Sequence, residues 1–293
     1  METKILFNMH IMWYESKMIY ETLDSIQNAA EHSKLPIEFR FCLNSQTYIE
    51  TPESGTAHDM FNEFMSHPLL KNSKLYYKTN NEEFYNIGDW RREQYDVDAK
   101  YTVWGESDCL LPEDFFYILS IIDIPEPHIL TFSSRKMWDS TWDVVEHTDL
   151  RKYNRDIHNV YQAPVPFNSC DVINQKELND YNNQFDIEIS KINTIKIDGS
   201  LLCISKNMIY KLIPDDMHFV REDFCAEQVL KKVDIPQYNI NTRIKGHNYS
   251  HANKRTNTSN TREDIVFKQF SEKSLESMNK FLYNYDINNN TIA

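Results

Sequence analysis

The chain has 293 residues, with 31 lysines and arginines against 44 aspartates and glutamates, and its formal net charge is −13. Hydrophobic residues make up 41% of the chain and aromatic residues 13%, which is typical of a folded globular protein and excludes a disordered one. The acidity argues against a protein that coats nucleic acid through nonspecific charge, but it does not exclude a local basic groove.

Glycine is scarce and scattered, since the only five are Gly55, Gly88, Gly105, Gly199 and Gly246. A Walker P-loop, a GxGxxG dinucleotide turn, a kinase glycine-rich loop and a GxSxG nucleophile elbow all need clustered glycines and are therefore excluded. A chain of this kind that binds nucleotide phosphates must hold them with a metal ion or with cationic side chains.

The cysteines and the N-terminus indicate a cytoplasmic protein. The five cysteines form no CxxC pair, so neither a zinc ribbon nor a disulfide framework is expected, and a reducing compartment fits best. The first residues do not form a signal peptide, and no stretch approaches the roughly 18 apolar residues of a membrane span.

The first 122 residues alternate strand and helix patterns, which predicts an α/β domain with a mostly parallel central sheet covered by helices on both faces. Ser16 is expected to cap the first helix, and Pro112 to occupy the first position of the last one. The predicted strands are 5–7, 37–43, 75–77 and 101–104, and the predicted helices are 16–30, 60–65, 87–96 and 112–122.

The pattern is less regular after residue 122, although one continuous domain is still expected. Residues 135–197 are polar and rich in asparagine, and they predict mostly loops. The glycine, asparagine and serine residues of 245–251 also predict a loop. Strands are predicted at 129–132, 200–204 and 238–244, and helices at 224–233 and 275–285.

Two carboxylates follow a buried strand in the segment Trp104-Gly-Glu106-Ser-Asp108. Ligands of parallel sheets bind beyond the carboxyl ends of the strands, and a spacing of two in extended chain points both side chains the same way. One or both carboxylates are thus candidates for binding Mg²⁺ or Mn²⁺. The alternative is a polar turn in which Asp108 only caps the helix expected at Pro112.

The stretch 101–115 resembles the DXD segment of GT-A glycosyltransferases, particularly the inverting family 2. The segment 86–92 resembles that family's glycine-then-arginine helix, and the resemblance resumes at 198–202 and 221–223. It implies a single-domain, Rossmann-like GT-A fold with a nucleotide-sugar half (1–122), an acceptor half (123–234) and a C-terminal strand, basic loop and helix (235–293). The first acid departs from the family pattern, because Glu106 stands where Asp is usual.

The resemblance also implies roles for single residues. Asp108 inherits the direct metal contact, while Glu106 contacts the metal, a metal-bound water or the ribose. Asp223 inherits the general base that takes the proton of the acceptor hydroxyl, with Glu222 as the neighbouring candidate. The ordinary alternative is that both acids only cap a helix. His247 fits a late histidine that completes the metal shell, unless it is a surface side chain.

Further donor contacts are implied near the first two strands. Trp13 and Tyr14 follow strand one, where the family places an aromatic ring against the nucleobase. Asn44 and Gln46 follow strand two, and an amide accepts or donates the hydrogen bond that the base requires. The donor-binding residues expected in total are Trp13, Tyr14, Asn44, Gln46, Arg91, Arg92, Glu106 and Asp108.

The acceptor is the least determined partner. Trp138 and Trp142 are either core residues or stacking platforms for a sugar or a base. Segment 237–262 carries five cations and no acid, namely Arg243, Lys245, Lys254, Arg255 and Arg262. These cations hold the donor diphosphate, solvate a loop, or (Lys254 and Arg255 in particular) meet a polyanionic acceptor. The glycine-poor, asparagine- and lysine-rich composition resembles that of a bacteriophage protein, so a hydroxymethylated base in phage DNA is one candidate acceptor and a glycan the other.

The sequence thus predicts an enzyme, a metal-dependent glycosyltransferase that moves a sugar from a nucleoside-diphosphate sugar, by expectation a UDP-sugar, to an acceptor hydroxyl with inversion. The enzymatic alternative is a nucleotidyltransferase of related fold. The alternative from another class is a non-catalytic module that binds glycans or nucleotides.

Overall fold

The structure is a computed structural model of the chain. It describes residues 3–15, 19–46, 62, 64–79, 81–107, 109–135, 175–193, 195, 197, 199–247 and 265–285. The described elements are β1 (Ile5–Met12), η1 (Trp13–Glu15), α1 (Tyr20–Glu31), β2 (Ile37–Asn44), α3 (Pro68–Lys71), β3 (Lys74–Lys78), α4 (Ile87–Glu93), β4 (Tyr101–Gly105), β5 (Cys109–Leu110), α5 (Phe115–Ile121), β6 (Ile129–Arg135), α7 (Gln175–Asn182), β7 (Ile189–Ile192), β8 (Leu201–Ser205), α8 (Glu222–Lys232), β9 (Gln237–His247) and α10 (Ile265–Tyr283).

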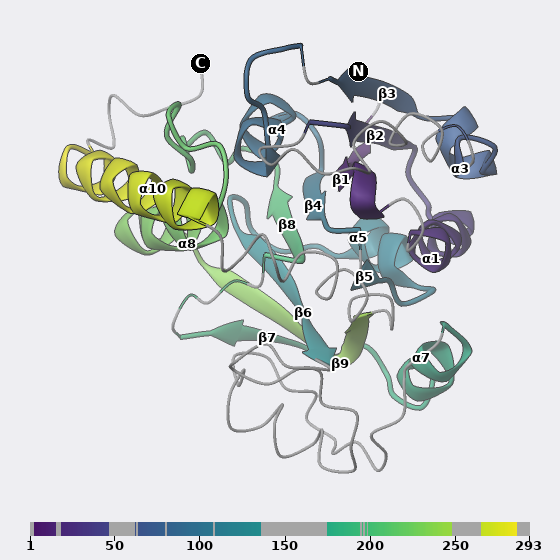
Figure 1. The fold of residues 1–293 in the computed structure, drawn as a ribbon. Helices are drawn as coiled ribbons and strands as arrows, with labels where there is room; N and C mark the ends of the chain where they lie inside the picture. Colours follow the sequence, from purple (N-terminus) through teal and green to yellow (C-terminus); the bar gives the residue numbers. More distant parts are fainter. Residues whose placement is uncertain are drawn as a thin grey trace, which may run out of the picture.

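A single nine-stranded sheet forms the centre of the domain (Figure 1). Its main path runs β3-β2-β1-β4-β8-β6-β9-β5, with β7 paired to β9. Strands β3, β2, β1 and β4 are mutually parallel, and β9 is parallel to β6. Strand β8 lies between these groups and is antiparallel to both β4 and β6. The carboxyl ends of β1, β2, β4, β6 and β9 therefore share one edge, and β8 begins there.

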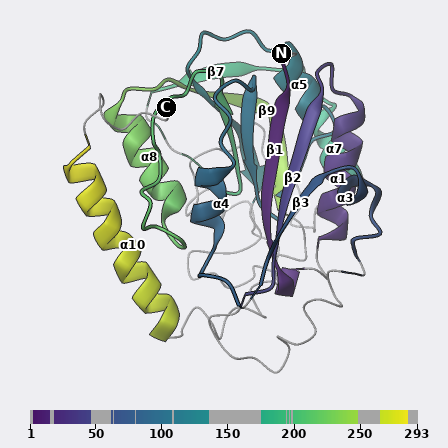
Figure 2. The same ribbon diagram turned by 90° about the horizontal axis from the view of Figure 1, so that it is seen from above.

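Helices cover both faces of the sheet, which confirms the predicted α/β architecture. Figure 2 shows α1, α3, α5 and α7 on one face and α4, α8 and α10 on the other. Alternate residues of β4 reach the two cores, because successive side chains of a strand point to opposite faces. Val103 packs in the core on the α1 side, and Trp104 packs in the core on the α8 side. Gly105 is required by close packing, since a Cβ there would lie 2.6 Å from the Phe7 ring.

The sheet is mixed: β1, β2, β3, β4, β6 and β9 run in one direction, as predicted for a mostly parallel sheet, and the remaining described strands run against them. Strand β8 and the short strands β5 and β7 all pair antiparallel. A fully buried strand such as Leu201–Ser205 is apolar on both faces, and this pattern carries no information about direction.

Several element boundaries also differ from the predictions. Helix α5 begins at Phe115, with Asp114 as its N-cap, so Pro112 precedes the helix and does not open it. Ile19, not Ser16, is the N-cap of α1, and Ser16 lies outside the described residues. The segment expected to be irregular contains α7 and β7. Strand β9 continues to His247 because β5 and β6 both pair with its last residues, so 245–247 is strand and not loop.

At the opposite ends of the strands, where β1, β2 and β3 begin, three cations gather around Glu38. Its carboxylate accepts from Lys4 at 2.7 Å, Arg40 at 2.6 Å and Lys74 at 2.8 Å, which links β1, β2 and β3. Although burial acts in the other direction, these three cations lower the pKa of Glu38 to about 2. Glu38 stays charged at neutral pH and stabilises the edge away from the strand carboxyl ends.

No helix in the described part of the chain is long and apolar enough to cross a membrane. The four described cysteines, Cys42, Cys109, Cys203 and Cys225, are buried and unpaired, in keeping with the expected absence of a disulfide framework among them.

Candidate active site

Arg91 joins three segments of the chain at the carboxyl edge of the sheet. Its side chain is 2% exposed. One guanidinium nitrogen donates to Glu222 Oε1 at 2.8 Å, and the other donates to Glu106 Oε1 at 3.3 Å and to the Gly199 carbonyl oxygen at 2.5 Å. The guanidinium carbon also lies 5.4 Å from the Trp104 ring centroid. The predicted site residues Arg91, Glu106 and Glu222 therefore meet at one side chain, together with the Gly199 backbone.

Helix α4 is held firmly enough to aim this arginine. Asn86 and Asp89 form a reciprocal capping box at its N-terminus. The backbone N–H of Gly88 donates to the His218 carbonyl at 2.9 Å, and a Cβ at Gly88 would collide with the Met217 carbonyl oxygen. A glycine is therefore required here for the close approach of the 217–218 backbone.

The next residue of the helix, Arg92, binds the segment that precedes α8. It donates to Asp89 Oδ1 at 2.6 Å and to the carbonyl oxygens of Pro214 at 2.7 Å and Met217 at 3.2 Å. Arg92 thus fixes the segment that leads to α8, and its predicted contact with the donor remains a prediction from the sequence.

Glu222 is buried next to Arg91, and its side chain is 8% exposed. Burial raises the pKa of Glu222 to about 7; Arg91 acts in the opposite direction, while the nearby charges of Asp223 and Glu106 raise it further. A carboxyl group that changes charge near neutral pH beside a buried guanidinium is typical of active sites, although structural ion pairs also produce such shifts.

A strained turn delivers Glu222 and Asp223 to this position. Val220 and Arg221 both have positive φ, 65° and 68°, and Arg221 is the N-cap of α8. A β-branched residue in this region is uncommon, and each such residue costs about 1–3 kcal/mol. Strain of this kind clusters at functional sites. Helix α8 holds the turn in place because Cys225, Ala226, Val229 and Leu230 are buried in the core.

Asp223 lies directly against Gly199. A Cβ at Gly199 would overlap the Asp223 carboxylate, while Asp223 Oδ1 accepts from the Phe224 backbone N–H at 2.7 Å. No described glycine has a positive φ. Gly199 is therefore needed for this close approach and not for a left-handed backbone conformation. Asp223 is half-buried, so its carboxylate is more accessible than that of Glu222.

Glu15 is a site component that the sequence reasoning missed. It is buried, with Oε1 accepting from Ser107 Oγ at 2.6 Å and Oε2 accepting from the Met12 backbone N–H at 2.7 Å. It links the end of β1 to the segment between Glu106 and Asp108. An acid three residues after an apolar strand was the available signal.

The candidate metal ligands are described only in part. Asp108 and the side chain of His247 lie outside the described residues, and the rest of the described chain has no group of three or more His, Cys, Asp or Glu that fits a metal. The backbone register pairs Cys109 with His247, so the residue after Asp108 and the predicted histidine are neighbours across the β5–β9 ladder. The Glu106 carboxylate at the same edge is 27% exposed. The carboxylate oxygens of Glu106 are ligands of the kind that Mg²⁺ and Mn²⁺ prefer.

The residues expected near the nucleobase are mostly bonded within the protein. Asn44 Nδ2 lies 3.0 Å from His10 Nε2 and donates to the Tyr85 carbonyl at 2.8 Å. Gln46 Nε2 donates to two backbone carbonyls, and Gln46 Oε1 accepts from the Tyr85 N–H. Trp13 is 6% exposed in the core, and the Tyr14 side chain lies outside the described residues. Contacts of these residues with a base remain predictions.

The acceptor residues Trp138, Trp142, Lys254 and Arg255 all lie outside the described residues. Two other cations of the basic segment are internal. Arg243 pairs with Asp114 at 2.6 Å, and the fully buried Lys245 donates to Ser200 Oγ at 2.5 Å. Both belong to β9, so neither solvates a loop.

Comparisons with known proteins give weak similarities. No protein-family model matches the chain, and no curated protein matches it. The galactosyltransferase LgtC, solved with donor and acceptor sugar analogues, aligns at 9% identity over 69% of this chain with a TM-score of 0.30, and the match spans 58% of LgtC. The 4-diphosphocytidyl-2C-methyl-D-erythritol synthase of Anaerococcus prevotii aligns at 9% identity over 85% of this chain and 90% of its own, with a TM-score of 0.35. The inositol-1-phosphate CTP transferase of T. maritima aligns at 8% identity over 94% and 97%, with a TM-score of 0.38. These scores are too low to assign an activity.

Proposed function

We propose that the chain is a metal-dependent glycosyltransferase of the GT-A type that uses a nucleoside-diphosphate sugar. The observation that carries this proposal is the position of Arg91. Three segments that were predicted to contribute to such a site, around Arg91, Glu106 and Glu222, are separated by up to 131 residues, and they meet at this one buried side chain. They do so where the carboxyl ends of the parallel strands converge, which is where α/β sheets bind ligands.

In this proposal Asp223 is the general base. Asp223 is the second residue of helix α8 and is half-buried, and its carboxylate lies against Gly199. It would accept the proton of the acceptor hydroxyl as that oxygen attacks the anomeric carbon, and attack from the face opposite the leaving group inverts that carbon. Glu222 is a positioning residue, because it is buried against Arg91 and faces away from solvent.

The donor diphosphate would lie over Glu106 and the end of β9. Asp108, Glu106 and His247 are the residues that would hold Mn²⁺ or Mg²⁺, and the ion when bound neutralises the diphosphate charge. Arg91 keeps the Glu106 carboxylate oriented through its 3.3 Å contact. The UDP moiety and the acceptor, a glycan or a hydroxymethylated base in DNA, remain predictions from the sequence.

The proposal is tested by product analysis and by one conservative variant. Wild-type protein incubated with UDP-sugars, Mn²⁺ and a panel of acceptors is expected to release nucleoside diphosphate, measured by chromatography. Asp223→Asn is expected to bind donor within a few-fold of wild type and to transfer roughly 10²–10⁴-fold more slowly. Glu276→Gln, which changes an exposed carboxylate on α10 away from the proposed site, is the matched control and should transfer like wild type.

The nucleotidyltransferase alternative predicts a different product. Such an enzyme would release pyrophosphate from a nucleoside triphosphate and a sugar phosphate. Release of pyrophosphate in place of nucleoside diphosphate would overturn the assignment as a glycosyltransferase. Tight donor binding without release of either product would favour a non-catalytic module.

A further inference from the structure

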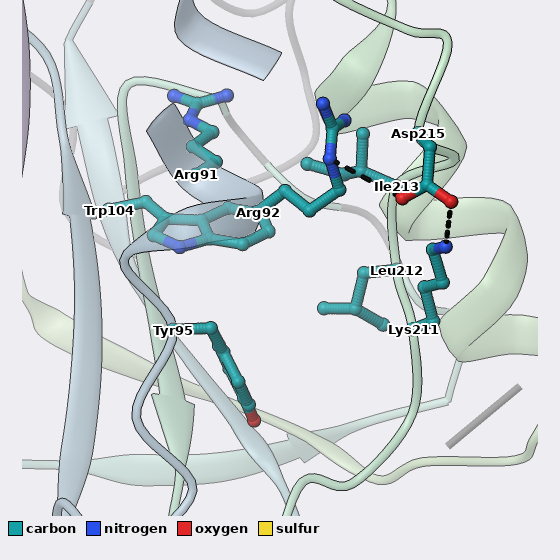
Figure 3. A pocket seen from close by; sticks show the side chains of 8 residues that line it. All are labelled: Arg91, Arg92, Tyr95, Trp104, Lys211, Leu212, Ile213 and Asp215. Carbon is teal, nitrogen blue, oxygen red and sulfur yellow. Dashed lines mark hydrogen bonds and ion pairs between the residues drawn. The ribbon is translucent and has the colours of Figure 1, made fainter. Parts of the chain in front are cut away.

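A cavity lined in part by Arg91 lies on the face of the sheet that α4 and α8 cover. Its volume is about 270 Å³, just below the roughly 300–1,000 Å³ of most small-molecule sites, so an occupant would be small. Figure 3 shows its lining: Arg91, Arg92, Tyr95, Trp104, Lys211, Leu212, Ile213 and Asp215. Strand β4 separates it from the core on the α1 side.

The inner wall is apolar and aromatic. Leu212 and Ile213 are 4% and 2% exposed, and the rings of Trp104 and Tyr95 complete this wall. The Tyr95 hydroxyl is bonded to the Met208 carbonyl at 2.5 Å, so the ring contributes its apolar face. Two aromatic walls and two aliphatic ones fit a flat ring better than a sugar.

One hydrogen-bond donor in this wall is unsatisfied. Trp104 is 2% exposed, and its indole nitrogen has no partner within the described protein. This nitrogen is itself buried, so a ligand in the cavity would meet the face of the Trp104 ring and not its N–H group.

The rim of the cavity is cationic. Arg92 and Lys211 lie at it with a single acid, Asp215, which pairs with Lys211 at 2.6 Å and lies 3.7 Å from Arg92 Nε. Asp215 is 80% exposed, whereas Lys211 is 29% exposed and Arg92 is 19% exposed. The terminal nitrogens of Arg92 already donate to Asp89, Pro214 and Met217, whereas Lys211 pairs with the well-solvated Asp215 and is the cation better placed to meet an anionic group.

We propose that this cavity binds a small planar aromatic carboxylate, with the ring between Trp104 and Tyr95 and the carboxylate near Lys211. Arg91 and Arg92 line this cavity and were also predicted to bind the donor, so competition with UDP and Mn²⁺ decides whether the two sites are separate. This proposal does not rest on the proposed transfer reaction, because it follows only from the shape, burial and charge of the cavity.

The test is isothermal titration of the full chain with indole-3-carboxylate, using indole and cyclohexanecarboxylate as probes that lack the charge or the aromatic ring. Indole-3-carboxylate is expected to bind with a Kd between roughly 0.05 and 2 mM, as expected for about twelve heavy atoms, and each of the other two at least five-fold more weakly. Absence of saturable binding up to about 10 mM, or equal binding of all three probes, would overturn the proposal.

Variants locate the binding. Leu212→Trp fills the cavity and is expected to weaken indole-3-carboxylate at least ten-fold, while Leu275→Trp, on the half-exposed face of α10, is the matched control and should leave the Kd unchanged. Equal binding by both variants and the wild type would contradict the assignment.

Charge changes at the rim keep the test independent of core packing. Lys211→Met is expected to weaken the binding of indole-3-carboxylate three- to ten-fold and to leave the binding of indole unchanged. Asp215→Asn is expected to strengthen the binding of indole-3-carboxylate. The opposite sign at Asp215 would overturn the proposed orientation. Displacement of the probe by UDP with Mn²⁺ would show that the cavity belongs to the donor site, which would overturn a second site without bearing on transfer.

Discussion

Arg91 and Glu222 lie 131 residues apart in the chain, and their side chains meet at 2.8 Å with 2% and 8% exposure. A buried ion pair contributes little net stability compared with apolar residues of the same shape, but a single buried charge without its partner is strongly unfavourable. The pair therefore fixes which arrangement of α4 and α8 the chain adopts, and so the position of Asp223.

The first prediction concerns this pair. Arg91→Met and Glu222→Leu should each lower the free energy of unfolding by about 1–3 kcal/mol, because the first leaves the buried Glu222 carboxyl without its donor and the second leaves one Arg91 nitrogen without its acceptor. The double variant should lose clearly less than the sum of the single losses, as urea denaturation will measure. Breaking the exposed pair with Lys211→Met should cost less than about 1 kcal/mol. Additive losses at Arg91 and Glu222 would show that the two side chains do not interact.

The second prediction concerns the pH dependence of stability. Unfolded Glu222 loses its proton near pH 4.5, whereas the folded protein keeps it to about pH 7. The folded state binds more protons in this window, so this group makes the protein less stable as the pH rises from 4.5 to 7, with a slope of at most about 1.4 kcal/mol per pH unit.

Glu222→Gln removes that titration. The difference in unfolding free energy between wild type and Glu222→Gln should therefore change across pH 4.5–7 and level off above it, measured by denaturation at each pH. A difference that is constant with pH would contradict a raised pKa for Glu222.

The third prediction concerns the contact of Gly199 with Asp223. Gly199→Ala places a methyl group where the Asp223 carboxylate lies, so that carboxylate must move. Transfer should fall about ten- to a hundred-fold with donor affinity nearly unchanged. Independently of activity, Gly199→Ala should cost less stability in an Asp223→Ala background than in the wild type, because the overlap with the carboxylate is removed and only the 3.1 Å approach to the Asp223 Cβ remains. Equal costs in both backgrounds would refute the contact.

The strands and the site segments follow from local pattern, whereas the pairings within the site do not. The burial of 101–105 and the polar residues after it place Glu106 at a strand end by periodicity alone. The approach of Gly199 to Asp223 depends on the antiparallel direction of β8, which its apolar sequence does not encode. For the same reason the need for glycine at 199 could not be predicted, and the structure shows that it lies in this close approach.

Arg91 shows the same limit. Its place in a helix after Gly88 was predicted, but its bond to Glu222 depends on how α4 and α8 pack on one face of the sheet. No spacing in the sequence reports a contact across 131 residues. Lys245 and Arg243 were counted with a basic loop for a similar reason, because the pairing of β9 with β5 and β6 was not visible from composition.

In the proposed site, Asp108 binds the metal ion on which binding of the nucleoside-diphosphate sugar depends. Calorimetric titration of UDP-sugar in the presence and absence of Mn²⁺ tests this role most directly. Wild type should bind only with the metal, and Asp108→Asn should abolish that binding because it removes the anionic ligand, while Glu106→Gln should be milder. Glu38→Gln, the same kind of change at the opposite edge of the sheet, should bind like wild type. Normal Mn²⁺-dependent donor binding by Asp108→Asn would contradict the account.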